Sequence, residues 1–221
     1  MSLDFSWLSP YQDAIFSGIL VTIRLTLIGG SLGFVLGVAT AWARVHGGPT
    51  LRWAAIAYVE GIRNTPFLVQ LLFIFFGLPA LGLRLTAEMS GIIALVVNTG
   101  AYMGEILRGG IEATHKGQYE AASSLAMSGY QTFRHVILFP SIQRVWPALV
   151  GQFILDMFQT SVISQIAVEE LTFVASFIQS RNFRAFETYI FMAGTYLVLA
   201  FLMRRLLLIA GRFVFRMGVA R

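Results

Sequence analysis

The chain has 221 residues, of which 57% are apolar and only 12% are charged, and its mean hydropathy is +0.73. A soluble globular domain carries roughly 25% charged residues, so this composition excludes a water-soluble body and indicates an integral membrane protein. The net charge of +5 does not indicate a nucleic-acid partner, because the basic residues lie between apolar runs and form no single patch. With no cysteine, the chain has neither disulfides nor thiolate metal sites.

Five segments are apolar over the roughly 20 residues that a helix needs to cross the hydrocarbon layer. Before them, MSLDFSWLSPYQD is acidic and has no basic leader, so we expect no signal peptide. Continuous apolar runs without period-two alternation favour helices over a barrel. The sequence thus predicts an all-α polytopic membrane protein of about five transmembrane helices, organised as one domain over residues 1–221. The segments are Ala14–Ala43, Ala55–Gly82, Met89–Leu107, Val145–Val168 and Tyr189–Ile209.

Basic residues divide unequally between the two sides that these spans define. Arg24 and Arg63 fall inside spans, and the larger group of the remainder predicts the cytoplasmic side. This rule places the N-terminus outside and the C-terminus in the cytoplasm, as an odd number of spans requires. The smaller group is Arg84, Arg181 and Arg184, and the larger is Arg44, Arg52, Arg108, Lys116, Arg134, Arg144, Arg204, Arg205, Arg212, Arg216 and Arg221.

Small residues recur every four positions in the first predicted span, where Gly29, Gly33 and Gly37 are followed by Ala41. Such a ridge lets another helix approach closely in a membrane, where packing rather than hydrophobicity drives association. The partner helix can belong to the same chain or to a second subunit, and the spacing alone favours neither.

One predicted cytoplasmic connection, residues 108–144, is much longer than the others. Its core, GQYEAASSLAMSGYQTFRHVILFP, begins with helix-forming residues and contains Gly129 as a break, which predicts a helix–turn–helix on the cytoplasmic surface. A simple linker is the alternative, but the pattern is too ordered for a flexible tether. We therefore expect this segment to dock another molecule.

Charges inside the predicted spans cost about 2.5–3.5 kcal/mol each on insertion scales and usually face a cavity or a partner. Glu60 and Arg63 are three residues apart, so a structural ion pair across one helical turn is favoured over a substrate contact. Glu105 lies near the cytoplasmic end of the third span. It can pair with Arg108 or belong to a substrate pathway, and the two roles are equally supported.

Asp156 lies near the middle of the fourth span and has no cation near it in the sequence, which favours a cavity-facing role. Together with the Thr160 and Ser161 hydroxyls it offers hydrogen-bond acceptors to a polar solute, and an amino group would suit the carboxylate best. Its replacement by asparagine is expected to weaken uptake of a cationic solute more than of a neutral one. The candidate pathway residues are Glu60, Arg63, Asn98, Tyr102, Glu105, Asp156, Thr160 and Ser161.

No catalytic or metal-binding residues are predicted. The histidines His46, His115 and His135 fall in predicted cytoplasmic loops without metal-ligand spacing. The run from Gly110 to Lys116 lacks the glycine before lysine that a phosphate-binding loop needs, so the chain cannot bind ATP through its own P-loop. Energy for pumping would come from a partner or an ion gradient. An ion-driven carrier acting alone is disfavoured because no inverted repeat is evident, and a membrane enzyme because acids and histidines do not cluster.

The long cytoplasmic segment resembles the EAA loop of binding-protein-dependent ABC permeases, in which E-A-A is followed by a glycine and later by an I-x-L-P turn. Glu120, Ala121 and Ala122 match its opening. Three further stretches resemble the polar amino-acid branch of this family, and together with the span spacing the resemblance covers about residues 14–212. They are YVEGIRNTPFLVQLLFIFFGLP (58–79), AYMGEILRGGI (101–111) and TSVISQIAVEEL (160–171).

The chain departs from the family pattern at three places. The glycine after E-A-A falls on Ala126, which keeps the small size that a close helix contact needs. The proline of the L-P turn falls on Phe139, with Pro140 one place later, which is expected to alter the angle of the second loop helix. Where the family often has a lysine in the fourth span the chain has Phe158, and Asp156 lies nearby, so a different substrate charge is expected.

The resemblance implies the type I ABC importer permease fold and, as its function, uptake of a polar amino acid across the bacterial inner membrane. Two permease subunits, identical or paired with a sister chain, would enclose the pathway, and an extracytoplasmic binding protein would deliver the amino acid. Separate ATPase subunits would bind ATP and Mg²⁺, so this chain holds no cofactor and is not an enzyme. The expected ATPase-coupling residues are Gly117, Glu120, Ala121, Ala122 and Ala126, with Glu120 giving polar contacts and the alanines close seating.

Overall fold

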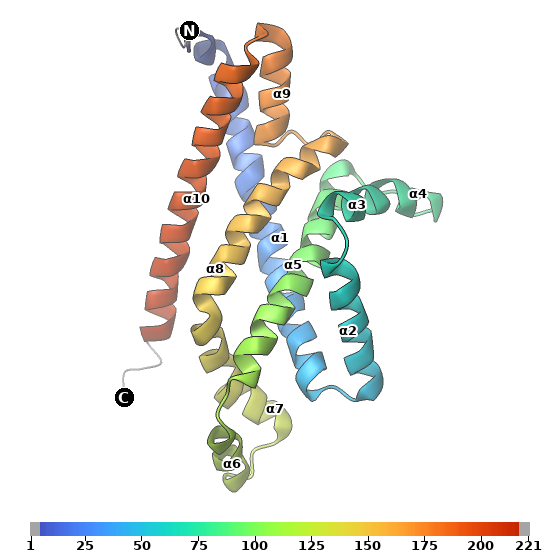
Figure 1. The fold of residues 1–221 in the computed structure, drawn as a ribbon, viewed down its shortest axis with the longest axis vertical. Helices are drawn as coiled ribbons and strands as arrows, with labels where there is room; N and C mark the ends of the chain where they lie inside the picture. The colour runs from blue at the N-terminus through green and yellow to red at the C-terminus, as the bar shows by residue number, and fades with distance from the viewer. Residues whose placement is uncertain (1–4, 217–221) are drawn as a thin grey trace.

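The computed structural model describes residues 5–216, and every regular element in that range is a helix, which confirms the all-α class. Figure 1 shows long helices packed side by side, a short arm projecting from one side (α3 and α4) and two small helices at one end (α6 and α7). The first half comprises η1 Ser6–Tyr11, α1 Gln12–His46, α2 Pro49–Arg63, α3 Phe67–Leu72, η2 Phe73–Gly77, α4 Leu78–Ala80 and α5 Ala87–Glu112. The second comprises α6 Lys116–Ser124, α7 Gly129–Gln131, η3 Thr132–Ile137, α8 Leu138–Ile163, η4 Ser164–Ile166, α9 Leu171–Asn182 and α10 Ala185–Arg216.

The ridge of small residues on α1 packs against α5 of the same chain. A Cβ atom added at Gly29 would lie 2.8 Å from the Leu95 Cβ, and one at Gly37 would lie 2.9 Å from the Met103 Cβ. Both distances are shorter than real contacts allow, so the two helices approach this closely only because the side chains are absent. Of the two readings that the spacing left open, the structure supports the internal contact.

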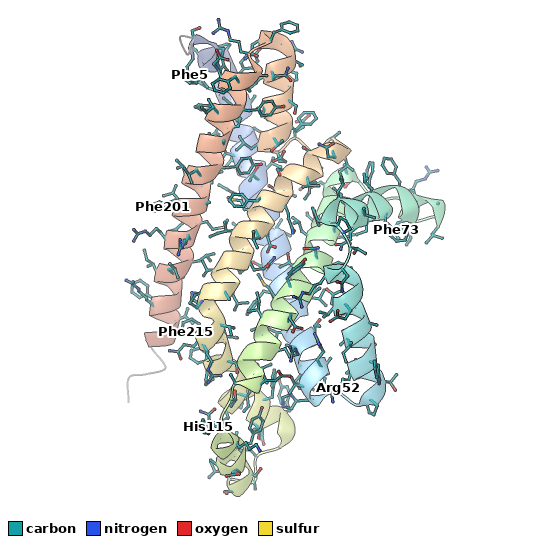
Figure 2. All side chains as sticks on the ribbon, viewed as in Figure 1. Phe5, Arg52, Phe73, His115, Phe201 and Phe215 are labelled. Atoms are coloured by element: carbon teal, nitrogen blue, oxygen red, sulfur yellow. The ribbon has the colours of Figure 1, made fainter. Side chains whose placement is uncertain are left out.

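The second predicted span is wrong as a single helix, because the chain turns by 108° between α2 and the arm that starts with α3. The turn occurs at Asn64–Pro66, where Pro66 lacks a backbone N–H and disfavours the helical conformation of the residue before it. Beyond the turn, η2 is a π-helical turn and α4 ends the arm. Phe73 lies on this arm in Figure 2.

The third predicted span corresponds to α5, and the fourth to α8 with seven further residues at its start. At the other end of α8, Ala167 takes a left-handed backbone conformation (φ 60°) that stops the helix. The chain continues, at an angle of 51°, as α9, a helix that the sequence did not predict. The side chain of Glu170 caps α9 by accepting a hydrogen bond of 2.8 Å from the Phe173 N–H.

The fifth predicted span lies within α10, a continuous helix of 32 residues. By length and apolar composition alone, two described stretches qualify as spans, Ser6–His46 and Ala87–Glu112, and up to four do if each bent pair is one span. α10 is not among these. With each bent pair counted as one span, four of the five predicted spans pass this test, and α10 holds the fifth predicted segment.

Apart from Arg84, which lies in the connection between α4 and α5 beside the arm, the two predicted groups of basic residues lie on elements toward opposite ends of the bundle. The α1–α2 turn, α6, α7 and the C-terminal end of α10 lie at one end in Figure 1, and the α9–α10 turn with Arg181 and Arg184 lies at the other. Arg52 marks the first end in Figure 2. Arg221, which the topology prediction includes, lies outside the described residues.

Candidate functional site

Three amide side chains form a chain of hydrogen bonds across α3, α5 and α8. The Asn98 amide donates to Gln70 Oε1 at 2.9 Å, and Gln159 Nε2 donates to Asn98 Oδ1 at 3.2 Å. Gln70 Nε2 in turn donates to the backbone oxygens of Ile62 at 2.7 Å and Thr65 at 3.1 Å. Since buried amides are costly unless bonded, this chain ties the α2–α3 turn to the middle of the bundle.

A pocket of 310 Å³ lies beside this chain, between α5 and α8. Its polar atoms come from one hydroxyl and two amides, which can donate and accept hydrogen bonds but carry no charge. Gln159 Oε1 is buried and has no hydrogen-bond partner among the described residues. The lining is Tyr102, Gln152, Leu155, Phe158, Gln159 and Val162.

Asp156 is fully buried and does not line this pocket. Its Oδ1 accepts a hydrogen bond of 2.9 Å from Gln152 Nε2, one turn earlier on α8. Asp156 Oδ2 and Thr99 Oγ1 have no partner with good hydrogen-bond geometry in the described part of the chain. The carboxyl group thus supports a pocket-lining amide from behind.

Glu105 is the centre of an ionic cluster that joins α1, α2 and α5. Its carboxylate contacts Arg44, Arg63 at 3.8 Å and Arg108 at 2.5 Å. Arg108 also pairs with Glu112 at 2.5 Å. The expected pairing of Glu105 with Arg108 is confirmed, and Arg44 and Arg63 extend it across two further helices.

The expected pairing of Glu60 with Arg63 is wrong. Among the described residues Glu60 accepts from Asn64 Nδ2 at 3.2 Å, whereas Arg63 turns toward Glu105 and stacks over the Tyr102 ring at 5.5 Å. Arg63 thus makes cation–π and ionic contacts that hold α2 against α5, in place of a weak exposed ion pair with Glu60. Because Tyr102 lines the pocket, Arg63 lies one side chain away from it.

The Thr160 and Ser161 hydroxyls both donate to backbone oxygens of their own helix, at 2.6 Å from Met157 O and Phe158 O. Thr160 is fully buried and Ser161 is half-buried. Their oxygens keep acceptor capacity, but the structure does not place them in the pocket lining. Of the candidate residues, Tyr102 lines the pocket and Asn98 bonds to the pocket-lining Gln159, whereas the others do not line it.

Within the long connection, α6 is anchored to the bundle by one face and exposed on the other. Ala122 is buried, and Tyr119 packs on an apolar cluster that includes Phe133 and Ile137. Gly117, Glu120 and Ala121 are exposed. Figure 1 shows α6 projecting beyond the ends of the long helices. Ala122 therefore seats α6 on its own chain, while Glu120 and Ala121 remain free for another molecule.

The break after α6 lies at Ala126 rather than at Gly129, where it was expected. Ala126 has a left-handed backbone with φ 53°, a conformation that glycine adopts at no steric cost. Gly129 is instead the first residue of α7, which Ser128 and Gln131 start with a capping box. The position where the family has a glycine, Ala126 in this chain, is thus the residue with the left-handed backbone. The π-helical turn η3 then leads into α8, whose first turn accommodates Pro140.

Several residues of the site were missed from the sequence. Gln70, Gln152 and Gln159 are amides within apolar runs, which is the same signal that selected Asn98. Arg44 was counted only as a topology residue. Glu170, fully buried, caps α9 and accepts a 2.6 Å hydrogen bond from Tyr196 of α10. Its signal was an acid directly before the apolar run LTFVASF.

Residues 33–216 match the family model described as "Binding-protein-dependent transport system inner membrane component". The chain belongs to this family. It is 36% identical over 212 residues to the glutamine transport system permease protein GlnP of Escherichia coli K12, covering 93% of this chain and 97% of that one. It is 38% identical to the probable glutamine ABC transporter permease protein GlnM of Bacillus subtilis 168, with 90% of each chain covered.

Solved structures agree with this assignment. A chain from the crystal structure of an amino acid ABC transporter with histidines is 36% identical to this permease. The match covers 96% of this chain and 99% of that chain, and the two superpose with a TM-score of 0.85. The MetNI methionine ABC transporter, at 20% identity and a TM-score of 0.75, shares the fold. The protein is thus a permease subunit of an amino-acid ABC transporter, a multi-pass protein of the inner membrane.

Proposed function

We propose that the permease imports a neutral polar amino acid, of the class of glutamine, and that residues 108–144 couple it to a separate ATPase subunit. The whole chain, residues 1–221, acts as one transmembrane domain in this proposal. The observation that carries it is the anchoring of α6, which is held on the bundle by Ala122 while Glu120, in the middle of the helix, is exposed. A segment fixed on one side and open on the other can transmit a push from a docked partner.

ATP and Mg²⁺ bind to the partner ATPase, and closure of its dimer rocks the permease between inward- and outward-facing states. The coupling residues are Gly117, Glu120, Ala121, Ala122 and Ala126. The ionic cluster around Glu105 supports this step, because it joins α1, α2 and α5 into one unit near the start of the coupling segment. An element that moves as a unit can be biased by both ATP and substrate.

The 310 Å³ pocket is the proposed substrate contact in this subunit. In this proposal Arg63, which stacks on the pocket-lining Tyr102, contacts the α-carboxylate, and the amides of Gln152 and Gln159 suit an uncharged polar side chain. The two relatives whose names state glutamine are consistent with this class. The buried position of Asp156 argues against the expected preference for a cationic amino acid.

The remaining partners follow from the same assignment. A second permease subunit, the same chain or a sister, encloses the other half of the pathway, and an extracytoplasmic binding protein delivers the amino acid. The coupling end of the bundle, with its larger group of basic residues, faces the cytoplasm. The N-terminus then lies outside and the C-terminus inside.

The test is uptake of radiolabelled glutamine into proteoliposomes that contain the permease, its ATPase partner and the binding protein. We expect uptake only with internal ATP and all three components, and stronger stimulation of ATP hydrolysis by glutamine than by arginine or glutamate. Glutamine movement by the permease alone, driven by an ion gradient, would overturn the proposal in favour of a carrier.

A further inference from the structure

A second and larger pocket, of 420 Å³, lies between the coupling-end halves of α8 and α10, outside the substrate site. Its floor is aromatic: Trp146 and Phe215 stack edge to face with ring centroids 5.4 Å apart, and Gly211 leaves room for the indole. Gln143 and Arg212, both exposed, form its polar rim. Phe215 is seen in Figure 2 near the lower end of α10.

The α10 face that borders this pocket is basic. Arg204 and Leu208 precede Gly211 and Phe215 at helical spacing (i, i+4, i+7, i+11), so all four lie on one face. Arg205 and Arg212, seven residues apart, lie along its edge. No acidic residue occurs in residues 138–155 of α8 or in residues 188–221. The positive charge of this face is therefore not neutralised by carboxylates of the helices that form the pocket.

The pocket also lies at the depth of lipid headgroups. The fifth predicted span, Tyr189–Ile209, has the roughly 20 residues that cross the hydrocarbon layer. The pocket residues 208–215 lie at its end. Tryptophan is typical of the interface between hydrocarbon and headgroups. Trp146 fits this position, and its indole N–H donates to Leu207 O at 3.1 Å.

We propose that this pocket binds the headgroup of an anionic phospholipid, with Arg212 contacting the phosphate and Gln143 an ester or headgroup oxygen. The charge and the depth together favour this occupant over an acidic protein segment, because the aromatic floor lies level with the lipid interface. The lipid would brace α10 against α8 on the side opposite to the apolar groove that Leu199, Leu202 and Leu206 line.

The proposal is tested on the full chain in nanodiscs of equal parts dioleoyl phosphatidylglycerol and dioleoyl phosphatidylcholine. After release into detergent, native mass spectrometry counts the lipids that stay bound. We expect the wild type to retain phosphatidylglycerol in preference to phosphatidylcholine. In Arg212→Gln the amount of retained phosphatidylglycerol should fall about fivefold. The matched control is Arg52→Gln, an exposed arginine of α2 that Figure 2 shows on the other side of the molecule, which should keep the wild-type preference.

A second measurement does not depend on folding of the arginine variant. The Trp146 fluorescence, taken as the difference between wild type and Trp146→Phe, should be quenched more by dibrominated phosphatidylglycerol than by dibrominated phosphatidylcholine. Equal quenching by both lipids, or an equal loss of phosphatidylglycerol in Arg52→Gln and Arg212→Gln, would overturn the site. Protection of Trp146 from both lipids would show that a protein subunit covers the pocket, and would overturn it too.

Discussion

Asp156 accepts a hydrogen bond of 2.9 Å from Gln152, and of these two residues only Gln152 lines the pocket between α5 and α8. The carboxyl group, chosen from the sequence as a direct substrate contact, therefore acts in the structure on the orientation of an amide. Asp156 could thus act by contacting the substrate or by orienting Gln152, and a single substitution of Asp156 would not distinguish these two roles.

Replacing Asp156 with asparagine keeps an oxygen that can accept from Gln152, whereas leucine removes it. We expect Asp156→Asn to keep glutamine uptake within about threefold of wild type, and Asp156→Leu to lose much more, because an unpaired buried amide costs about 1–3 kcal/mol. The measurement is initial uptake of glutamine and of arginine in proteoliposomes. A selective loss of arginine uptake in Asp156→Asn would instead restore the carboxylate as a direct contact for a cationic substrate.

The ionic cluster gives a prediction about stability. Glu105→Gln leaves Arg44, Arg63 and Arg108 facing one another without their shared carboxylate, in a place where Arg44 is only 13% exposed. We expect a loss of about 1–3 kcal/mol, between the values for exposed and buried pairs. Thermal unfolding of the purified permease in detergent measures it.

The control is Glu112→Gln, because the Glu112 side chain is 52% exposed and its carboxylate contacts Arg108. We expect its effect on stability to stay below about 1 kcal/mol, as for surface pairs. Equal unfolding temperatures for the two variants would show that Glu105 is not the centre of the cluster.

Ala126 and Ala121 give opposite expectations for the same substitution. Ala126→Gly relieves a left-handed backbone (φ 53°) and should stabilise the coupling segment by about 1 kcal/mol. Ala121→Gly, inside α6, should destabilise it by a similar amount, because glycine is a poor helix former. Limited proteolysis of the connection reports both, as slower cleavage in the first variant and faster cleavage in the second. Cleavage rates that change in the same direction would contradict this assignment of the break.

The helical class and the helical character of each apolar segment could be predicted, because apolar length and period are properties of the sequence itself. Pro66 is a signal for a bend in the sequence itself. Because the apolar run continues beyond this proline, the segment was nevertheless predicted as one span. Which helix meets the ridge at Gly29 and Gly37 could not be predicted, since small residues permit close contact without naming a partner. Arg63 shows the same limit: its distant partner Glu105 depends on how α2 folds back against α5.

The exposed face of α6 leads to the prediction that tests coupling most directly. Glu120→Lys reverses the charge of a side chain that faces away from the bundle, so we expect normal folding but weak association with the ATPase partner. The measurement is the amount of ATPase that co-purifies, together with the ratio of glutamine taken up to ATP hydrolysed. Asp13→Lys makes the same charge change in the first turn of α1, at the end of the bundle opposite to α6, and should leave co-purification unchanged. Full co-purification with wild-type uptake in Glu120→Lys would remove Glu120 from the docking surface, and the exposed Leu125 and Tyr130 would then be the next side chains to test.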